Sequence, residues 1–123
     1  GIFTFLISTS HCADREMLAS MWENRSDHAG EEETSMVMHL RPDLVRTDRI
    51  DDNPRNAPVV DVVNEFNPDF VRPWHLYIPT SAGGDARKAS AEKGERAISS
   101  SVDGMGRFLA GLSEAPDTDT FPY

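Results

Sequence analysis

A nearly continuous run of apolar residues opens the chain, Gly1-Ile2-Phe3-Thr4-Phe5-Leu6-Ile7, and it closes at Ser8-Thr9-Ser10. Unbroken apolarity in β-branched and aromatic residues is typical of a short strand covered on both faces of a parallel sheet. The run lacks the length, the basic flank and the cleavage site of a signal peptide. Because a lone strand of this kind aggregates, we expect residues 2–7 to pair with later strands of this chain or with polypeptide that is absent from it. The chain would then be the carboxy-terminal piece of something longer.

Two helices are predicted next. Residues 14–23 have the pattern of a short helix, and a second helix is expected to run to about Leu40. Arg41-Pro42 stops the second helix, because proline removes a backbone donor and disfavours a helical residue before it. The expected inward-facing residues are Met17, Leu18 and Met21 in the first helix and Met36, Val37 and Leu40 in the second.

The middle of the chain predicts a loop and two extended segments. Residues 46–56 are charged and irregular, which indicates a surface loop. Residues 58–63 predict a short strand or a buried turn. Residues 70–78, with Trp74 and Tyr77, predict a second strand, in which Trp74 would belong to the core or rim of the sheet.

A long amphipathic helix is predicted after a glycine-rich loop at residues 79–85. Asp85 is a plausible cap, and the helix should run from about Ala86 to Leu112. Its buried face should carry the apolar residues spaced by three, four and seven: Ala91, Ile98, Val102, Met105, Phe108, Leu109 and Leu112. Residues 113–123, with two prolines and three acids, predict an extended tail.

Composition excludes several classes of partner. The 123 residues make one modest domain, and the net charge of −9 with a pI near 4.7 argues against nucleic acid and anionic membranes, since both need clustered Lys and Arg. The single cysteine, Cys12, cannot form an internal disulfide, and no apolar run has the length of a membrane span. These features predict a soluble, cytoplasmic protein.

The strongest chemical signal is Asp27-His28-Ala29-Gly30-Glu31-Glu32-Glu33-Thr34-Ser35, at the expected start of the second helix. Asp27 could cap that helix, and acids in the first turn are stabilised by the helix dipole, which accounts for two of the three glutamates. Local helix chemistry does not account for His28. Taken alone, His28 is more often a capping or surface residue, but it can also shuttle a proton or stabilise an oxyanion near neutral pH.

Two other patterns are weaker. His11, Cys12 and Asp14 are close in sequence, but their spacing fits no standard zinc site. The Gly83-Gly84-Asp85 loop precedes a helix but lacks the full phosphate-binding pattern, so a plain helix entry is the better interpretation.

The string at His28 resembles the His-Ala-Gly-x-x-Glu-Thr-Ser signature of the creatininase (creatinine amidohydrolase) family, whose members hydrolyse C–N bonds at a two-metal site. Residues 36–45, Met-Val-Met-His-Leu-Arg-Pro-Asp-Leu-Val, and residues 80–94, Thr-Ser-Ala-Gly-Gly-Asp-Ala-Arg-Lys-Ala-Ser-Ala-Glu-Lys-Gly, are similar to later segments of the same family. An alanine follows Asp85 where the family usually has proline, and the glycine spacing differs. These departures affect a cap and a loop.

The resemblance implies an α/β fold, a three-layer αβα sandwich of creatininase type, with residues 1–112 as its second half and residues 113–123 as a tail. The family's Glu-x-His and Asn-Gly-His-Gly-Gly-Asn metal-binding strings do not occur here, so no metal ligand is assigned to this chain. Two divalent ions, zinc, manganese or iron, are expected in the assembled enzyme. The expected partners are an amino-terminal half on another polypeptide and further copies in a homo-oligomer, a hexamer by family.

By resemblance, His28 and Glu33 are the catalytic residues, and Trp22 borders the substrate pocket, although packing is an equal alternative for Trp22. Glu31 and Glu32 are expected to be solvated. The implied activity is metal-dependent hydrolysis of a small cyclic amide, amide or formamide. The alternative is a noncatalytic partner subunit or truncated relic that stabilises an oligomer.

Overall fold

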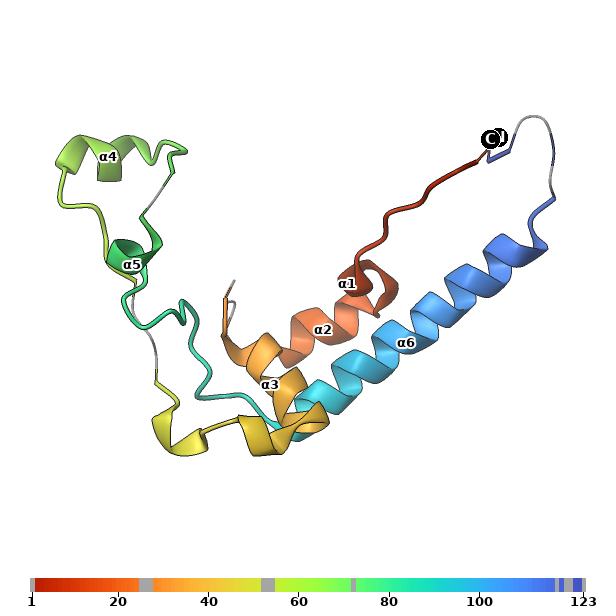
Figure 1. The fold of residues 1–123 in the computed structure, drawn as a ribbon, viewed down its shortest axis with the longest axis horizontal. Helices are drawn as coiled ribbons and strands as arrows, with labels where there is room; N and C mark the ends of the chain where they lie inside the picture. The colour runs from red at the N-terminus through yellow and green to blue at the C-terminus, as the bar shows by residue number, and fades with distance from the viewer. Residues whose placement is uncertain are drawn as a thin grey trace.

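A computed structural model describes residues 2–24, 28–51, 55–71, 73–116, 118 and 121–122, and every regular element in these ranges is helical. The α-helices are α1 (Thr9–Cys12), α2 (Arg15–Met21), α3 (Glu31–Leu40), α4 (Asp61–Phe66), α5 (Trp74–Tyr77) and α6 (Ala91–Glu114). Two short 3-10 helices follow α3, η1 (Pro42–Leu44) and η2 (Thr47–Arg49). Figure 1 shows α2 and α3 beside the long α6, an arm that carries α4 and α5, and a second arm where the chain ends meet.

The predicted αβα sandwich is wrong for this structure, because the described ranges contain no strand and therefore no sheet. Residues 2–7 are irregular, and Ile2 and Leu6 are fully exposed, at 97% and 101%. Apolar β-branched composition predicts a strand only where another strand can complete its backbone hydrogen bonds. No such partner lies in the described part of this chain.

The two other extended predictions are also wrong. Residues 61–66 form α4, which ends at Asn67 in the left-handed conformation, with φ of 42°. Residues 74–77 form α5, which Pro73 precedes as its N-cap. Proline pre-sets a helical φ and needs no donor at a helix start, so Pro73 favours a helical turn where the apolar run predicted a strand.

The first two predicted helices are confirmed in position, whereas Val37 and Leu40, which were expected to face inward, are 40% and 61% exposed. The Asp14 carboxylate caps α2 by accepting from the backbone N–H groups of Glu16 and Met17, each at 3.0 Å. Met21 on this helix is buried. Helix α3 ends at Leu40 with Arg41 as its C-cap, as the Arg41-Pro42 pair predicted.

The long helix begins later than predicted. Ser90 is the N-cap of α6, and its hydroxyl accepts from the backbone N–H of Lys93 at 3.2 Å. Asp85, the predicted cap, instead pairs with Arg87, which lowers the pKa of the Asp85 carboxyl to about 2. The sequence alone therefore does not show whether an acid near a helix start caps that helix, because the carboxylate can bind a neighbouring side chain or backbone N–H group instead.

Small residues, not the predicted apolar stripes, make the contact between α6 and the shorter helices. The buried residues of α6 are Gly94, Ala97 and Gly104. A Cβ on Gly94 would overlap the backbone of Ser35 in α3, and a Cβ on Gly104 would overlap the backbone of Cys12 in α1. The predicted core residues Val102 and Leu109 are 63% and 55% exposed. The helices pack at backbone distance through glycines, and this close approach turns several large side chains outward.

The two chain ends meet through aromatic rings. Phe121 contacts Phe3 and Phe5 edge to face, with ring centroids 5.3 and 6.3 Å apart, and Phe5 also contacts Phe108 of α6 at 6.3 Å. The tail therefore folds back on the amino-terminal segment (Figure 1). In the portions of the chain that are described, no helix has the length and apolarity needed to cross a bilayer.

Candidate functional site

His28 lies in a turn that enters α3, and this turn is held from both sides. Ala29 has a left-handed backbone, with φ of 51°, which is strained for a residue with a Cβ. The carbonyl oxygen of His28 accepts from the backbone N–H of Gly83 at 3.0 Å. The glycine-rich loop before α6 thus fixes the backbone of the residue that the signature singled out.

Glu33 holds the same turn from within α3. Its Oε2 accepts from the backbone N–H of Ala29 at 2.6 Å, a short charge-assisted bond. The Thr34 hydroxyl donates to the Ala29 carbonyl at 3.4 Å. The structure therefore brings Glu33 to the residue next to His28 and gives its carboxylate a positioning role at the strained turn.

Trp74, not Trp22, lies against the exposed His28 ring. The Trp74 and His28 rings meet edge to face with centroids 5.1 Å apart, so α5 covers one side of the imidazole. Trp22 is half-buried at the C-cap of α2, and its indole N–H is buried without a partner among the described residues. The apolar pattern had assigned Trp74 to a strand, and no feature of the sequence pairs it with His28.

Glu31 is the larger surprise, because it is fully buried and not solvated as predicted. Its Oε1 pairs with the Lys93 ammonium of α6, and its Oε2 accepts from the backbone N–H groups of Glu23 and Asn24 at 2.9 and 2.6 Å. Lys93, the cation that a buried carboxylate needs, belongs to the Glu92-Lys93-Gly94 segment noted for its resemblance, but no feature of the sequence pairs it with Glu31. Glu32, half-buried beside it, has its pKa raised by burial and then by the charge of Glu33.

A cleft of about 790 Å³ opens beside the turn. Ala29, Glu33 and Thr34 line it together with Thr80 and Ala82 from the loop before α6. The remaining lining residues are Val37, Leu44, Val45, Arg46, Arg49, Ile50, Asp51 and Ala86. The lining combines two carboxylates, of Glu33 and Asp51, with the guanidinium groups of Arg46 and Arg49, and has the size and polarity to hold a small polar molecule.

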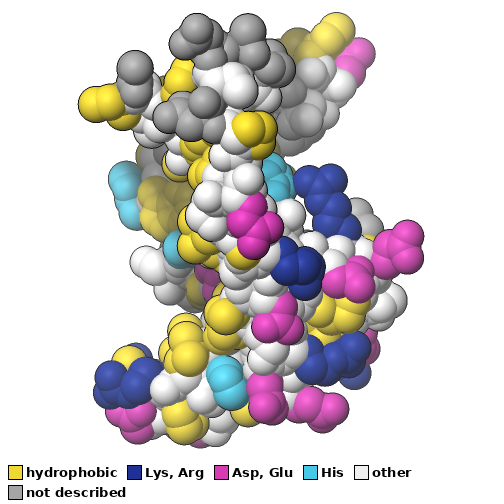
Figure 2. All heavy atoms as spheres, turned by 90° about the vertical axis from the view of Figure 1, so that its right-hand side faces the viewer, with side chains coloured by type: hydrophobic (Ala, Val, Ile, Leu, Met, Phe, Trp, Pro, Cys, Tyr) yellow, Lys and Arg dark blue, Asp and Glu magenta, His cyan; other side chains and the backbone are white. Residues whose placement is uncertain are grey.

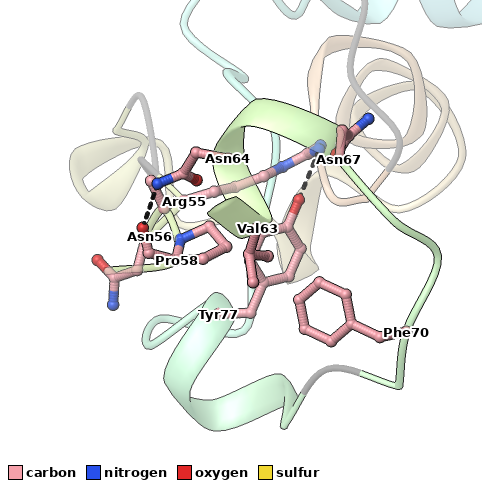
Figure 3. A pocket seen from close by; sticks show the side chains of 9 residues that line it. Arg55, Asn56, Pro58, Val63, Asn64, Asn67, Phe70 and Tyr77 are labelled. Carbon is pink, nitrogen blue, oxygen red and sulfur yellow. Dashed lines mark hydrogen bonds between the residues drawn. The ribbon is translucent and has the colours of Figure 1, made fainter. Parts of the chain in front are cut away.

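Figure 3 shows a second, smaller pocket of about 270 Å³ in the arm of α4 and α5. Arg55 crosses it, donating from Nη1 to the Tyr77 hydroxyl at 3.3 Å and from Nε to the Gly83 carbonyl at 2.7 Å. Asn64 donates to the Pro58 carbonyl at 2.7 Å. Because Gly83 also binds His28, Arg55 connects this arm to the His28 turn.

The donor set of the described residues does not fit a metal centre. In the part of the sequence that the structure describes, no three His, Cys, Asp or Glu side chains are grouped so that they could hold an ion. Cys12 donates to the Ser8 carbonyl at 3.6 Å, and the Asp14 carboxylate caps α2. Asp27, the predicted cap of α3, lies outside the described residues, and Gly30 is the N-cap.

The comparisons with known proteins agree on one family. The family model described as creatinine amidohydrolase matches residues 2–109. A protein of known structure from Bacteroides fragilis NCTC 9343, assigned as a creatinine amidohydrolase, is 26% identical with a TM-score of 0.72, covering 92% of this chain and 44% of that one. A W154F mutant creatininase is 28% identical with a TM-score of 0.53, covering 70% of this chain and 32% of that one. No curated protein matches the chain.

The chain thus spans less than half the length of either solved structure. The match includes the His28 turn, Glu33, Trp22 and most of α6, because all of these lie within residues 2–109. The family assignment therefore rests on the same segment that carries the candidate site.

Proposed function

Because the chain belongs to the creatininase family of creatinine amidohydrolases, we propose that it contributes the His28 turn of a metal-dependent amidohydrolase. The substrate class is a small cyclic amide, amide or formamide. One observation carries the proposal: an exposed histidine precedes the strained residue Ala29, in a turn that Glu33 and Gly83 both hold, and Ala29 lines a cleft. Strained residues held by their surroundings are concentrated at functional sites.

The chain's own residues would donate a proton to the leaving group and stabilise the negative oxygen that forms during hydrolysis. Hydrolysis of an amide needs a donor for the leaving nitrogen and stabilisation of the oxygen that becomes negative. His28 can do either, with Trp74 limiting its ring orientation. Glu33 would hold the turn, with the second role of a proton relay. Trp22, whose buried indole N–H lacks a partner among the described residues, would offer that donor at the substrate pocket.

The two divalent ions, zinc, manganese or iron, would be held mainly outside this chain's described residues, since those residues form no three-ligand group. We therefore propose a creatininase-type amino-terminal half on another polypeptide as partner, in a cytoplasmic homo-oligomer that is hexameric by family. Exposed apolar side chains support a surface that a partner covers in the assembly, because Val59 and Val71 are 95% and 98% exposed on the arm of α4 and α5. Figure 2 shows hydrophobic side chains open to solvent between charged ones on another face.

The second candidate is a noncatalytic subunit that stabilises an oligomer. It is favoured by the hydrogen bond of Glu33 to Ala29, because a carboxylate that already serves the backbone does not need a chemical role. Both candidates predict a partner, and only the first predicts that His28 matters for turnover.

The test purifies the full chain with its copurifying polypeptides, identifies them by mass spectrometry, and measures hydrolysis of creatinine, an acyclic amide and a formamide. His28→Ala in the active complex should lower turnover by roughly a hundredfold, the effect of a lost acid–base or oxyanion group. Glu32→Gln is the matched control and should leave turnover unchanged. An active complex that tolerates His28→Ala would support the noncatalytic role.

A further inference from the structure

The buried Glu31 carboxylate binds the chain directly after α2. Both backbone N–H groups that it accepts from, of Glu23 and Asn24, belong to the chain between α2 and α3. Asn24 precedes His28 by four positions in the sequence. A carboxylate that accepts two backbone N–H groups and a cation has its charge well satisfied, which is the condition for keeping it out of water.

Lys93 completes this arrangement from α6. Its ammonium donates to Glu31, to Glu23 Oε1 at 3.0 Å and to the Lys88 carbonyl at 3.1 Å, so its three donors have three acceptors. Hydrogen bonding to Glu31, and then to Glu23, raises the pKa of Lys93. The cation is thus held in one place and joins α6, the segment after α2, and α3.

Packing alone does not require this network. A buried ion pair is often no more stabilising than apolar residues of the same volume. Unlike apolar contacts, however, its hydrogen bonds require a fixed geometry of the groups that they join. The directional element here is the bonding of Glu31 to two successive backbone amides. The His28 turn leads directly into Glu31, and the backbone N–H of Gly83 also holds it through the His28 carbonyl.

We propose that Glu31 and Lys93 are positioning residues for His28, an inference that rests on the proposed function. They hold Glu31, the first residue of α3, against α6, and residues 28–30 lead directly into it, so the pair determines where the imidazole lies relative to Trp74 and the cleft. A purely structural pair between α3 and α6 would stabilise the helices without affecting His28.

Two readouts test this on the full chain without any enzyme assay. In the wild-type chain, NMR hydrogen exchange should show protection of the Glu23 and Asn24 amides. In Glu31→Gln, which has nearly the same shape, these amides should exchange at least about tenfold faster, since a bond to a charged acceptor is stronger than one to a neutral amide. Unprotected amides in the wild type would overturn the proposal even if every variant failed to fold.

The second readout follows His28 itself. In a Trp22→Phe background, Trp74 is the remaining tryptophan, and its fluorescence should change when His28→Ala removes the imidazole that contacts it. Glu31→Gln and Lys93→Met should reduce this response at least twofold, and Lys93→Arg should restore most of it. Glu92→Gln, which removes an exposed charge next to Lys93, is the control.

An unchanged Trp74 response in folded Glu31→Gln would show a structural pair only and would overturn the positioning role. If both readouts behave as expected and the purified complex hydrolyses none of the three substrates, the proposed function fails and the network's control of His28 stands. The two failures are therefore distinguishable.

Discussion

Gly94 of α6 lies against the backbone carbonyl of Ser35 in α3, so closely that a Cβ at position 94 would overlap it. The Ser35 hydroxyl donates to the Glu31 carbonyl at 2.6 Å and accepts from the backbone N–H of Ser90 at 3.1 Å. The N-cap of α6 and the first turns of α3 are therefore held as one unit. Because His28 and Glu33 sit at that end of α3, the glycine contact places the candidate site.

Gly94→Ala should destabilise the chain by about 1–3 kcal/mol, the usual effect of forcing an extra carbon into a close contact. This loss is expected although alanine is the better helix former by about 1 kcal/mol. Urea unfolding followed by circular dichroism measures the difference in the free energy of unfolding.

Gly106→Ala and Gly111→Ala are matched controls on the same helix, because a Cβ at either position meets nothing within 4 Å. Both should be neutral or stabilising by up to about 1 kcal/mol. Equal stability of Gly94→Ala and Gly111→Ala would contradict the close helix contact.

The helices of the central unit could be predicted, but their packing could not. Helix ends follow local rules, such as the Asp14 cap of α2 and the Arg41-Pro42 stop after α3. Which face is buried depends on the neighbouring helix, and glycines on α6 allowed an approach that buried Gly94 and Gly104 in place of Val102 and Leu109. The predicted strands failed for a related reason, since a strand is defined by its hydrogen-bonded neighbours.

The site was predicted in part. The motif located His28 and Glu33 in one turn, because their spacing and the glycine between them are local features. The ring contact of Trp74 and the pairing of Glu31 with Lys93 join residues 46 and 62 positions apart. Burial of Glu31 could not follow from three adjacent glutamates, since helix geometry alone does not say which of them faces α6.

Glu32→Gln should stabilise the chain slightly at neutral pH, because burial and the charge of Glu33 outweigh the favourable helix-dipole interaction of a first-turn acid. Burial, and then the charge of Glu33, raises the pKa of Glu32 above its ordinary value of 4.5, so the folded state disfavours the ionised form. The penalty is present above the folded pKa and disappears below about 4.5, where the acid is protonated in both states.

Thermal unfolding of both proteins between pH 4 and pH 8 would measure this effect, with the gain shrinking as the pH falls. Glu16→Gln removes an exposed acid from the first turn of α2 and should give no gain at any pH. A stabilisation by Glu32→Gln that persisted undiminished at pH 4 would contradict burial of the charge as its cause.

Ala29→Gly should stabilise the His28 turn. Ala29 has φ of 51°, a conformation that destabilises residues with a Cβ by roughly 1–2 kcal/mol and that glycine adopts freely. The gain is partly offset because glycine makes the unfolded chain more flexible, leaving a net stabilisation of up to about 1 kcal/mol. Denaturant unfolding checks the sign, and Ala19→Gly, in the exposed middle of α2, is the control that should lose about 1 kcal/mol.

The strain at Ala29 also gives a test of Glu33. If the bond from the Ala29 N–H to the Glu33 carboxylate holds Ala29 in its strained conformation, Glu33→Ala should be less destabilising when residue 29 is glycine than when it is alanine. Equal losses in the two backgrounds would mean that Glu33 does not hold the turn, and its carboxylate would then be available for a purely chemical role.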